Sequence, residues 1–145
     1  MTYPKLILFA LILCSVAVWG CSSNTASSSG FGSGSGYSIN LTTTQSTLPQ
    51  GGSTTLIAAV RDAQGNPVND STNNAVSFTS SLGGTFTYPN TPNSTTGNIV
   101  GGVCTAIYAT PATTISTIGS AGGVDQVTAS YRGASAFVSI FVFRP

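Results

Sequence analysis

The chain has 145 residues, of which only 5% are charged, and it contains no histidine. Glutamate is also absent, so Asp62, Asp70 and Asp125 are its only acidic side chains. General acid–base catalysis needs a group that titrates near neutral pH and a partner that orients it. The composition therefore predicts that the protein is not an enzyme. The formal net charge of +1, without a basic run, argues against a nucleic-acid partner.

The amino-terminal segment predicts export from the cytoplasm. Lys5 is followed by an apolar run over residues 6–19, which is shorter than the ~20 residues of a membrane-crossing helix. Such a run is typical of the hydrophobic region of a secretory signal peptide. The residues that follow, from Val18 to Cys21, resemble the lipobox of a bacterial lipoprotein, with a small residue before the cysteine.

This resemblance implies that residues 1–20 are removed as a signal peptide and that acyl chains attached to Cys21 hold the protein on a membrane. Ser22 stands where an aspartate would signal inner-membrane retention, so the resemblance favours the outer membrane of the bacterial envelope. Ordinary secretion and an uncleaved amino-terminal anchor remain the alternatives.

Residues 21–36 are rich in serine and glycine and carry no charge. A segment of this composition buries too little apolar surface to offset its chain entropy. We therefore expect a flexible tether over 21–36 and a folded domain over 37–145.

The domain is predicted to be all-β, because β-branched and aromatic segments alternate with turn residues at short intervals. The expected strands are Ser38–Thr43, Thr54–Arg61, Ala75–Thr79, Thr85–Tyr88, Val103–Ala109, Gln126–Tyr131 and Ala134–Phe143. The last segment is apolar on both faces toward its end, which predicts that it is central, covered by the tether, or part of a contact surface. Cys104 shares a face with Ala106 and Tyr108 and is expected to be a buried small side chain.

The most specific motif is Val60-Arg-Asp-Ala-Gln-Gly-Asn-Pro-Val68. It resembles a turn of the bacterial immunoglobulin-like domains of group 1, the repeats of invasin and intimin adhesins. The segments Ala75–Phe78, Gly83–Phe86 and Gly102–Tyr108 match further family motifs in order. The resemblance implies an immunoglobulin-like antiparallel sandwich of about seven strands. It also implies a structural or adhesive role, with an envelope protein as the partner.

The three acids are assigned to structural roles. Asp62 is expected to cap the turn, because it can accept hydrogen bonds from backbone N–H groups two or three residues further on. A calcium loop is disfavoured, since the glycine position and the distal glutamate of such a loop are missing. Asp70 and Asp125 are expected to be solvated loop acids, with Asp125 also a candidate to cap the entry of a strand. Arg61 and Arg132 are candidates to pair with them across strand edges, where an ion pair contributes little. No metal or other cofactor is predicted.

Two long loops, over residues 88–101 and 111–123, are the places where a partner could bind. Tyr88, Asn90 and Asn93 are candidate interaction residues there, for a carbohydrate or another surface polymer as the alternative function. On the last strand, Phe141 and Phe143 are candidates for contact with a protein.

Overall fold

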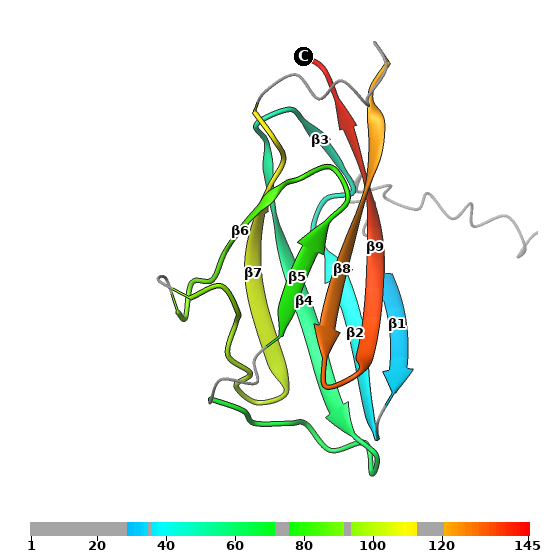
Figure 1. The fold of residues 1–145 in the computed structure, drawn as a ribbon, viewed down its shortest axis with the longest axis vertical. Coiled ribbons are helices and arrows are strands. Elements are labelled where there is room, and N and C mark those ends of the chain that lie inside the picture. Colours follow the sequence, from blue (N-terminus) through cyan, green and yellow to red (C-terminus); the bar gives the residue numbers. More distant parts are fainter. Residues whose placement is uncertain (1–28, 35, 72–75, 92–93, 113–120) are drawn as a thin grey trace, which may run out of the picture.

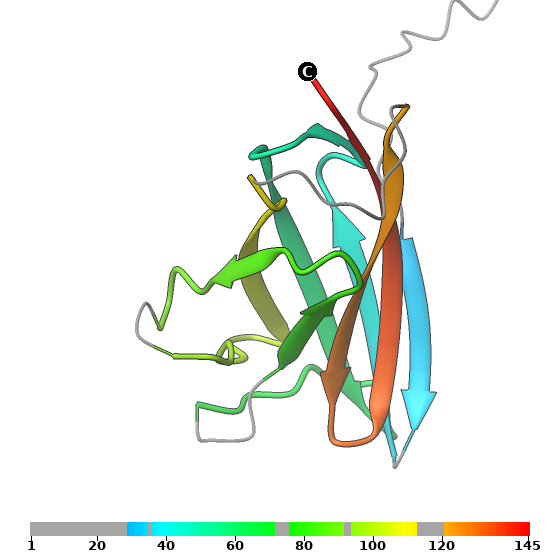
Figure 2. The same cartoon turned by 45° about the horizontal axis from the view of Figure 1, so that its top comes forward.

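The computed structural model describes residues 29–34, 36–71, 76–91, 94–112 and 121–145. Over these residues the chain is all-β, and two sheets stack to form a sandwich, which Figures 1 and 2 show from two directions. The predicted fold class, an immunoglobulin-like β-sandwich, is confirmed. The expected signal peptide and Cys21 lie outside the described residues.

Nine strands are found in the described residues. They are β1 (Ser29–Gly34), β2 (Tyr37–Thr43), β3 (Thr47–Pro49), β4 (Ser53–Asp62), β5 (Ser77–Ser80), β6 (Thr85–Thr87), β7 (Val103–Ala109), β8 (Gly123–Tyr131) and β9 (Ala134–Phe143). The first sheet has the order β1-β2-β4-β7-β6 and the second has the order β3-β9-β8-β5. Neighbouring strands are antiparallel, except that β3 runs parallel to β9.

Side-chain alternation decides which face of each strand enters the core between the sheets. In β4, Leu56, Ala58 and Val60 are fully buried, whereas Ile57 between them is exposed. β9 buries its even-numbered residues in the same way and presents Phe137 and Phe141 outward. β9 lies between β3 and β8, so the strand that is apolar on both faces is central in its sheet and also carries exposed aromatic rings.

Each of the seven expected strands corresponds to an observed one, and Val103–Ala109 and Ala134–Phe143 have the predicted bounds. β1 and β3 are additional. The coil predicted for the serine- and glycine-rich segment is wrong over Ser29–Gly34, because these residues form β1, which is paired with β2. The folded part of the described chain therefore begins at Ser29 and not at Tyr37.

Glycines explain why β1 fits beside β9. Gly30, Gly32 and Gly34 alternate along β1 and so share one face of the strand. A Cβ atom on Gly30 or Gly32 would collide with a backbone carbonyl of β9, which belongs to Phe137 or Ser135 respectively. Only glycine allows two backbones to approach so closely. β1 is thus hydrogen-bonded to the first sheet and lies against β9 of the second (Figures 1 and 2).

Candidate functional site

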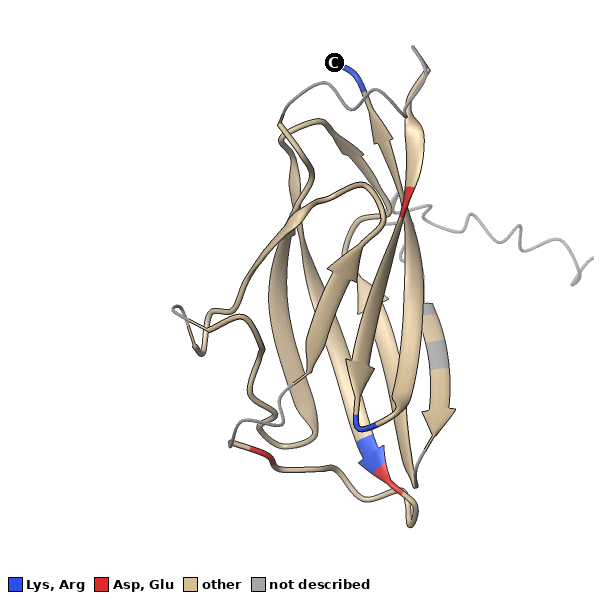
Figure 3. Cartoon of the chain, viewed as in Figure 1, with Lys and Arg blue, Asp and Glu red and all other residues tan. Residues whose placement is uncertain are grey.

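Most charged side chains of the described chain lie at one end of the sandwich. Figure 3 shows charged residues gathered at its lower end, where β4 ends and the turn between β8 and β9 lies. Arg61 and Asp62 end β4, and Arg132 in that turn is paired with Asp70. We call the opposite end, where β9 ends, the upper end. The lower end combines a capped turn, a cluster around Arg132 and a pocket, and it is the candidate site for a polar partner.

The turn after β4 has the predicted chemistry. The Oδ1 atom of Asp62 accepts hydrogen bonds from the backbone N–H groups of Gln64 and Asn66 at 3.0 and 2.8 Å. The bond from Asn66 is the main cause that lowers the pKa of Asp62 below its usual value. Gly65 has a φ of +82°, which glycine adopts without strain. The turn-capping role predicted for Asp62 is confirmed.

Arg132 connects three residues from different parts of the chain. Its guanidinium forms an ion pair with Asp70 at 3.2 Å and donates a hydrogen bond to the Tyr37 hydroxyl at 3.1 Å. The Tyr131 hydroxyl also donates to Asp70, at 3.0 Å. Burial, followed by this contact with Asp70, raises the pKa of Tyr131 to about 12. Asp70 is buried, so its prediction as a solvated loop acid was wrong.

The aromatic rings complete this cluster. The rings of Tyr37 and Tyr131 meet edge to face with centroids 5.2 Å apart. The guanidinium carbon of Arg132 lies 5.6 Å from the first ring centroid and 5.4 Å from the second. Arg132 also has a φ of +44°, a conformation that is uncommon for residues other than glycine. The contacts of its side chain stabilise this turn conformation. The sequence analysis gave Arg132 as a candidate surface partner of the acids, but it did not identify the two tyrosines of the cluster.

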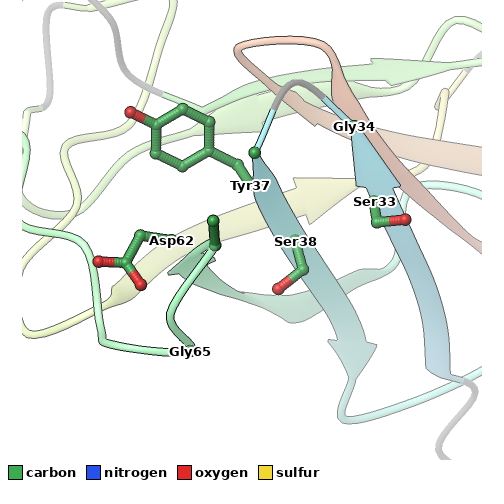
Figure 4. Close-up of a pocket in the computed structure, with 8 residues that line it drawn as sticks. Ser33, Gly34, Tyr37, Ser38, Asp62 and Gly65 are labelled. Atoms are coloured by element: carbon green, nitrogen blue, oxygen red, sulfur yellow. The ribbon is translucent and has the colours of Figure 1, made fainter.

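An open pocket of about 500 Å³ lies beside this cluster, between the β1–β2 connection and the Asp62 turn. Figure 4 shows the Asp62 carboxylate and the Tyr37 ring on one side of it, with Ser33 and Ser38 on the adjacent strands β1 and β2. Hydroxyl groups, a carboxylate and an aromatic ring suit a neutral polar ligand such as a saccharide. The pocket depends on β1, which the sequence analysis assigned to the tether.

The third acid lies inside the sandwich. Asp125 of β8 is 0% exposed, so its prediction as a solvated loop acid was wrong. Its carboxylate accepts hydrogen bonds from the Ser80 hydroxyl (2.6 Å), the Ser81 hydroxyl (2.9 Å), the Leu82 N–H (3.0 Å) and the Tyr108 hydroxyl. Tyr108 belongs to β7 of the first sheet, so Asp125 links the two sheets through a buried hydrogen bond. Four donors compensate for the removal of the carboxylate from water.

The loop residues that were predicted to bind a partner do not form one accessible group. Tyr88 is 3% exposed, and its ring packs on Phe78 with centroids 6.0 Å apart. Its role as an exposed stacking platform is therefore contradicted, because a buried ring cannot be reached by a ligand. Asn90 is exposed, whereas Asn93 lies outside the described residues. Much of the second loop, residues 113–120, also lies outside them.

The predicted residues on β9 are more accessible. Phe141 is 39% exposed, and Phe143 is partly exposed. Two further exposed apolar residues were not predicted as interaction residues, namely Phe137 (53%) and Val124 (59%). The period-2 pattern of β9 could have identified Phe137, because it shares a face with Phe141.

Cys104 is fully buried, as predicted, and burial raises the pKa of its thiol to about 12. The described residues contain no group of three side chains suited to hold a metal ion. Within the same residues, no helix is long and apolar enough to cross a membrane. A comparison with protein-family models gives no match, and a comparison with curated proteins gives none either. The similarity to bacterial immunoglobulin-like domains thus remains a resemblance of motifs.

Proposed function

We propose that this chain is a lipid-anchored protein of the bacterial cell envelope that presents a non-catalytic immunoglobulin-like sandwich to an envelope protein. In this proposal Cys21 carries the acyl chains, and the outer membrane is the site of anchoring. The support comes from the apolar run over residues 6–19, from the lipobox-like residues before Cys21 and from a β-sandwich that follows shortly afterwards.

The proposal of a non-catalytic role is supported by the contacts that the three aspartate side chains make. Asp62 holds a turn, Asp70 is paired with Arg132 and Tyr131, and Asp125 is buried under four donors. Each of these carboxylates therefore stabilises the fold through the contacts that it makes. An interaction protein needs this stable scaffold and an accessible surface, and the outer sheet faces supply the surface.

The surface that best suits an envelope protein is the outer face of β4 and β7, which we call the β4–β7 patch. Ile57, Val103 and Ile107 are all exposed there. Ile57 lies directly across from Thr105, which stands between Val103 and Ile107 on the same face of β7. The three apolar side chains are therefore neighbours on one surface. Exposed apolar patches on sheet faces are typical of contact surfaces.

Metabolic labelling tests the anchor. Cells that express the chain are grown with a labelled fatty acid, and we expect label on the wild-type protein and none on Cys21→Ala. Cys14→Ala is the matched control, because it removes the other cysteine of the amino-terminal segment and should retain the label. Undiminished label on Cys21→Ala would contradict the anchor.

Photo-crosslinking in cells tests the protein partner. A photoreactive residue replaces Ile107, and the matched control places it at Gln126, an exposed residue on the outer face of the other sheet. We expect a discrete adduct with an envelope protein from position 107, and its loss when Ile57→Asp is added. Equal adducts from both positions, or an adduct that Ile57→Asp leaves intact, would contradict binding at the β4–β7 patch.

A surface polymer is the second candidate partner, and the pocket at the lower end favours it. Ser33, Ser38 and Asp62 offer hydrogen-bonding groups beside the Tyr37 ring. A glycan array with the full chain tests this candidate. Binding that is lost in Ser38→Val and kept in Asn90→Ala supports the pocket and argues against the loop over residues 88–101.

A further inference from the structure

The outer face of β8 and β9 combines aromatic side chains with an absence of charge. The two strands lie side by side along the sandwich (Figures 1 and 2). The side chains that they present outward are Val124, Gln126, Thr128 and Ser130 from β8, and Ser135, Phe137, Ser139, Phe141 and Phe143 from β9. None of these is charged, so the face offers no counter-charge to a charged partner. Aromatic residues without charges are typical of the centre of a protein interface.

The pairing of β8 with β9 divides this face into rows that run across the two strands. Toward the upper end, Val124 lies directly across from Phe141, and both are exposed. Nearer the lower end, Thr128 lies across from Phe137 in the same way. Gln126 is exposed in the polar row between them. In each outer row a large ring on β9 therefore stands beside a smaller β-branched side chain on β8, so the surface is raised over β9 and lower over β8.

This surface is complementary to a second copy of itself. A two-fold axis that runs parallel to the strands, between β8 and β9, places β9 of one copy over β8 of the other at the same level. Phe141 of each copy then lies over Val124 of the other, and Phe137 lies over Thr128. The two polar rows also meet, so that the Gln126 amides face polar groups. Sheets that stack face to face with nearly aligned strands, ~10 Å apart, are a common arrangement in β-sandwiches.

The size of the face fits a weak, reversible pair. The ten residues of β9 extend over ~33 Å, and the four strands of the sheet cover ~19 Å at a normal spacing. Because β3 and β5 are short, the usable face is roughly 500 Å² per copy, or ~1,000 Å² for the pair. Stable specific interfaces bury about 1,200–2,000 Å², and transient ones bury less. The area therefore suits association that depends on local concentration.

We propose that the outer face of β8 and β9 binds a second copy of this chain, with Phe137 and Phe141 of each copy packed over β8 of the other. The β4–β7 patch belongs to the other sheet, so the pairing leaves it uncovered in both copies. A pair thus presents two β4–β7 patches on its opposite faces. This goes beyond the single interaction module of the proposed function and gives the chain a way to bind two partners at once.

Crosslinking between two tagged copies tests the pairing in cells. The full-length chain is co-expressed with two different epitope tags, and a photoreactive phenylalanine analogue replaces Phe137. The matched control places the analogue at Ile107, which is exposed on the outer face of the first sheet. From position 137 we expect an adduct that carries both tags and has the mass of two chains, several-fold more abundant than from position 107. Position 126 should give the same two-tag adduct, which its mass distinguishes from an adduct with an envelope protein.

Charge substitutions test how the two copies are aligned. Val124→Asp in both copies should reduce the two-tag adduct several-fold, because each carboxylate would be buried against Phe141 of the other copy. Ile57→Asp, on the first sheet, is the matched control and should leave the adduct unchanged. When one copy carries Val124→Asp and the other carries Phe141→Lys, opposite charges meet and the adduct should recover. Ile57→Lys in place of Phe141→Lys should give no recovery.

Several results would overturn the proposal. Adducts from position 137 that carry only one tag would show that a different molecule covers the face. Equal two-tag adducts from positions 137 and 107 would show proximity without a specific interface. An adduct that Val124→Asp leaves intact, or one that Phe141→Lys fails to restore, would overturn the two-fold arrangement. The envelope-protein adduct expected from position 107 carries one tag, so the pairing and the proposed function can fail independently.

Discussion

The buried carboxylate of Asp125 provides the sharpest test of how this charge-poor chain uses its acids. In Asp125→Ala, four donors lose their acceptor at once, namely the hydroxyls of Ser80, Ser81 and Tyr108 and the backbone N–H of Leu82. Each buried donor without an acceptor costs about 1–3 kcal/mol. The serine hydroxyls can rotate toward other acceptors, so these costs do not simply add. We expect the free energy of unfolding to fall by about 4 kcal/mol.

A loss of this size is a large part of the roughly 5–15 kcal/mol that stabilises a typical domain. Urea unfolding followed by circular dichroism measures it. Tyr108→Phe removes one of the four donors and keeps the ring in the core, so we expect a smaller loss of about 1.5–2 kcal/mol. Asp62→Ala is the matched control for the removal of an acid, and its effect should be much smaller because the Asp62 turn lies on the surface.

The reasoning would be refuted by either of two results. If Asp125→Ala lowers the free energy of unfolding by less than about 1 kcal/mol, the buried contacts do not stabilise the native state. If Tyr108→Phe is as destabilising as Asp125→Ala, the inter-sheet bond alone accounts for the effect, and the donors of Ser80, Ser81 and Leu82 contribute nothing measurable.

Three further outcomes follow from burial and from close backbone contact. Cys104 is buried and the pKa of its thiol is about 12, so a thiol reagent at pH 8 should label it only after denaturant is added; rapid labelling of the native protein would contradict this. Folding raises the pKa of Tyr131 from 10.0 to about 12, so its contribution to stability is complete below pH 10 and is lost as the pH rises through 12. Urea unfolding of Tyr131→Phe should therefore show a shallower alkaline decline than the wild type, and equal slopes would argue against a raised pKa of Tyr131 in the folded state. Gly32→Val places a Cβ atom in the backbone of β9, so amide hydrogen exchange in β1 should accelerate, whereas exchange in the exposed control Ser33→Val should match the wild type.

Local chemistry explains what could be predicted from the sequence. In β4 and β9, apolar side chains recur at every second residue, and this period alone defines a strand with one buried face. The turn at Asp62 is local as well, because the carboxylate bonds to residues only two and four positions away. Cys104 was placed correctly for the same reason, since it alternates with residues on the outer face of β7.

Long-range contacts explain what could not be predicted. Asp125 and Ser80 are 45 residues apart in sequence, and Arg132 and Asp70 are 62 apart. Nothing near Asp70 in the sequence distinguishes a buried carboxylate from a solvated one. Asp125 alternates with the buried residues Val127 and Ala129 of β8, but the expected strand began only at Gln126. Tyr88 shows the same limit, because an aromatic residue beside a polar loop looks accessible until its packing against Phe78 is known.

β1 was missed for a more specific reason. Its composition argues for a coil, since glycine and serine bury little apolar surface and lose much conformational freedom on folding. That argument holds when side chains must supply the contact. Here the backbone of β2 supplies the hydrogen bonds, and the backbone of β9 lies so close that a side chain on Gly30 or Gly32 would exclude β1. The alternating glycines that favoured a tether are thus the residues that β1 requires. Because β1 is part of the sandwich, the described fold begins at Ser29, at the edge of the first sheet.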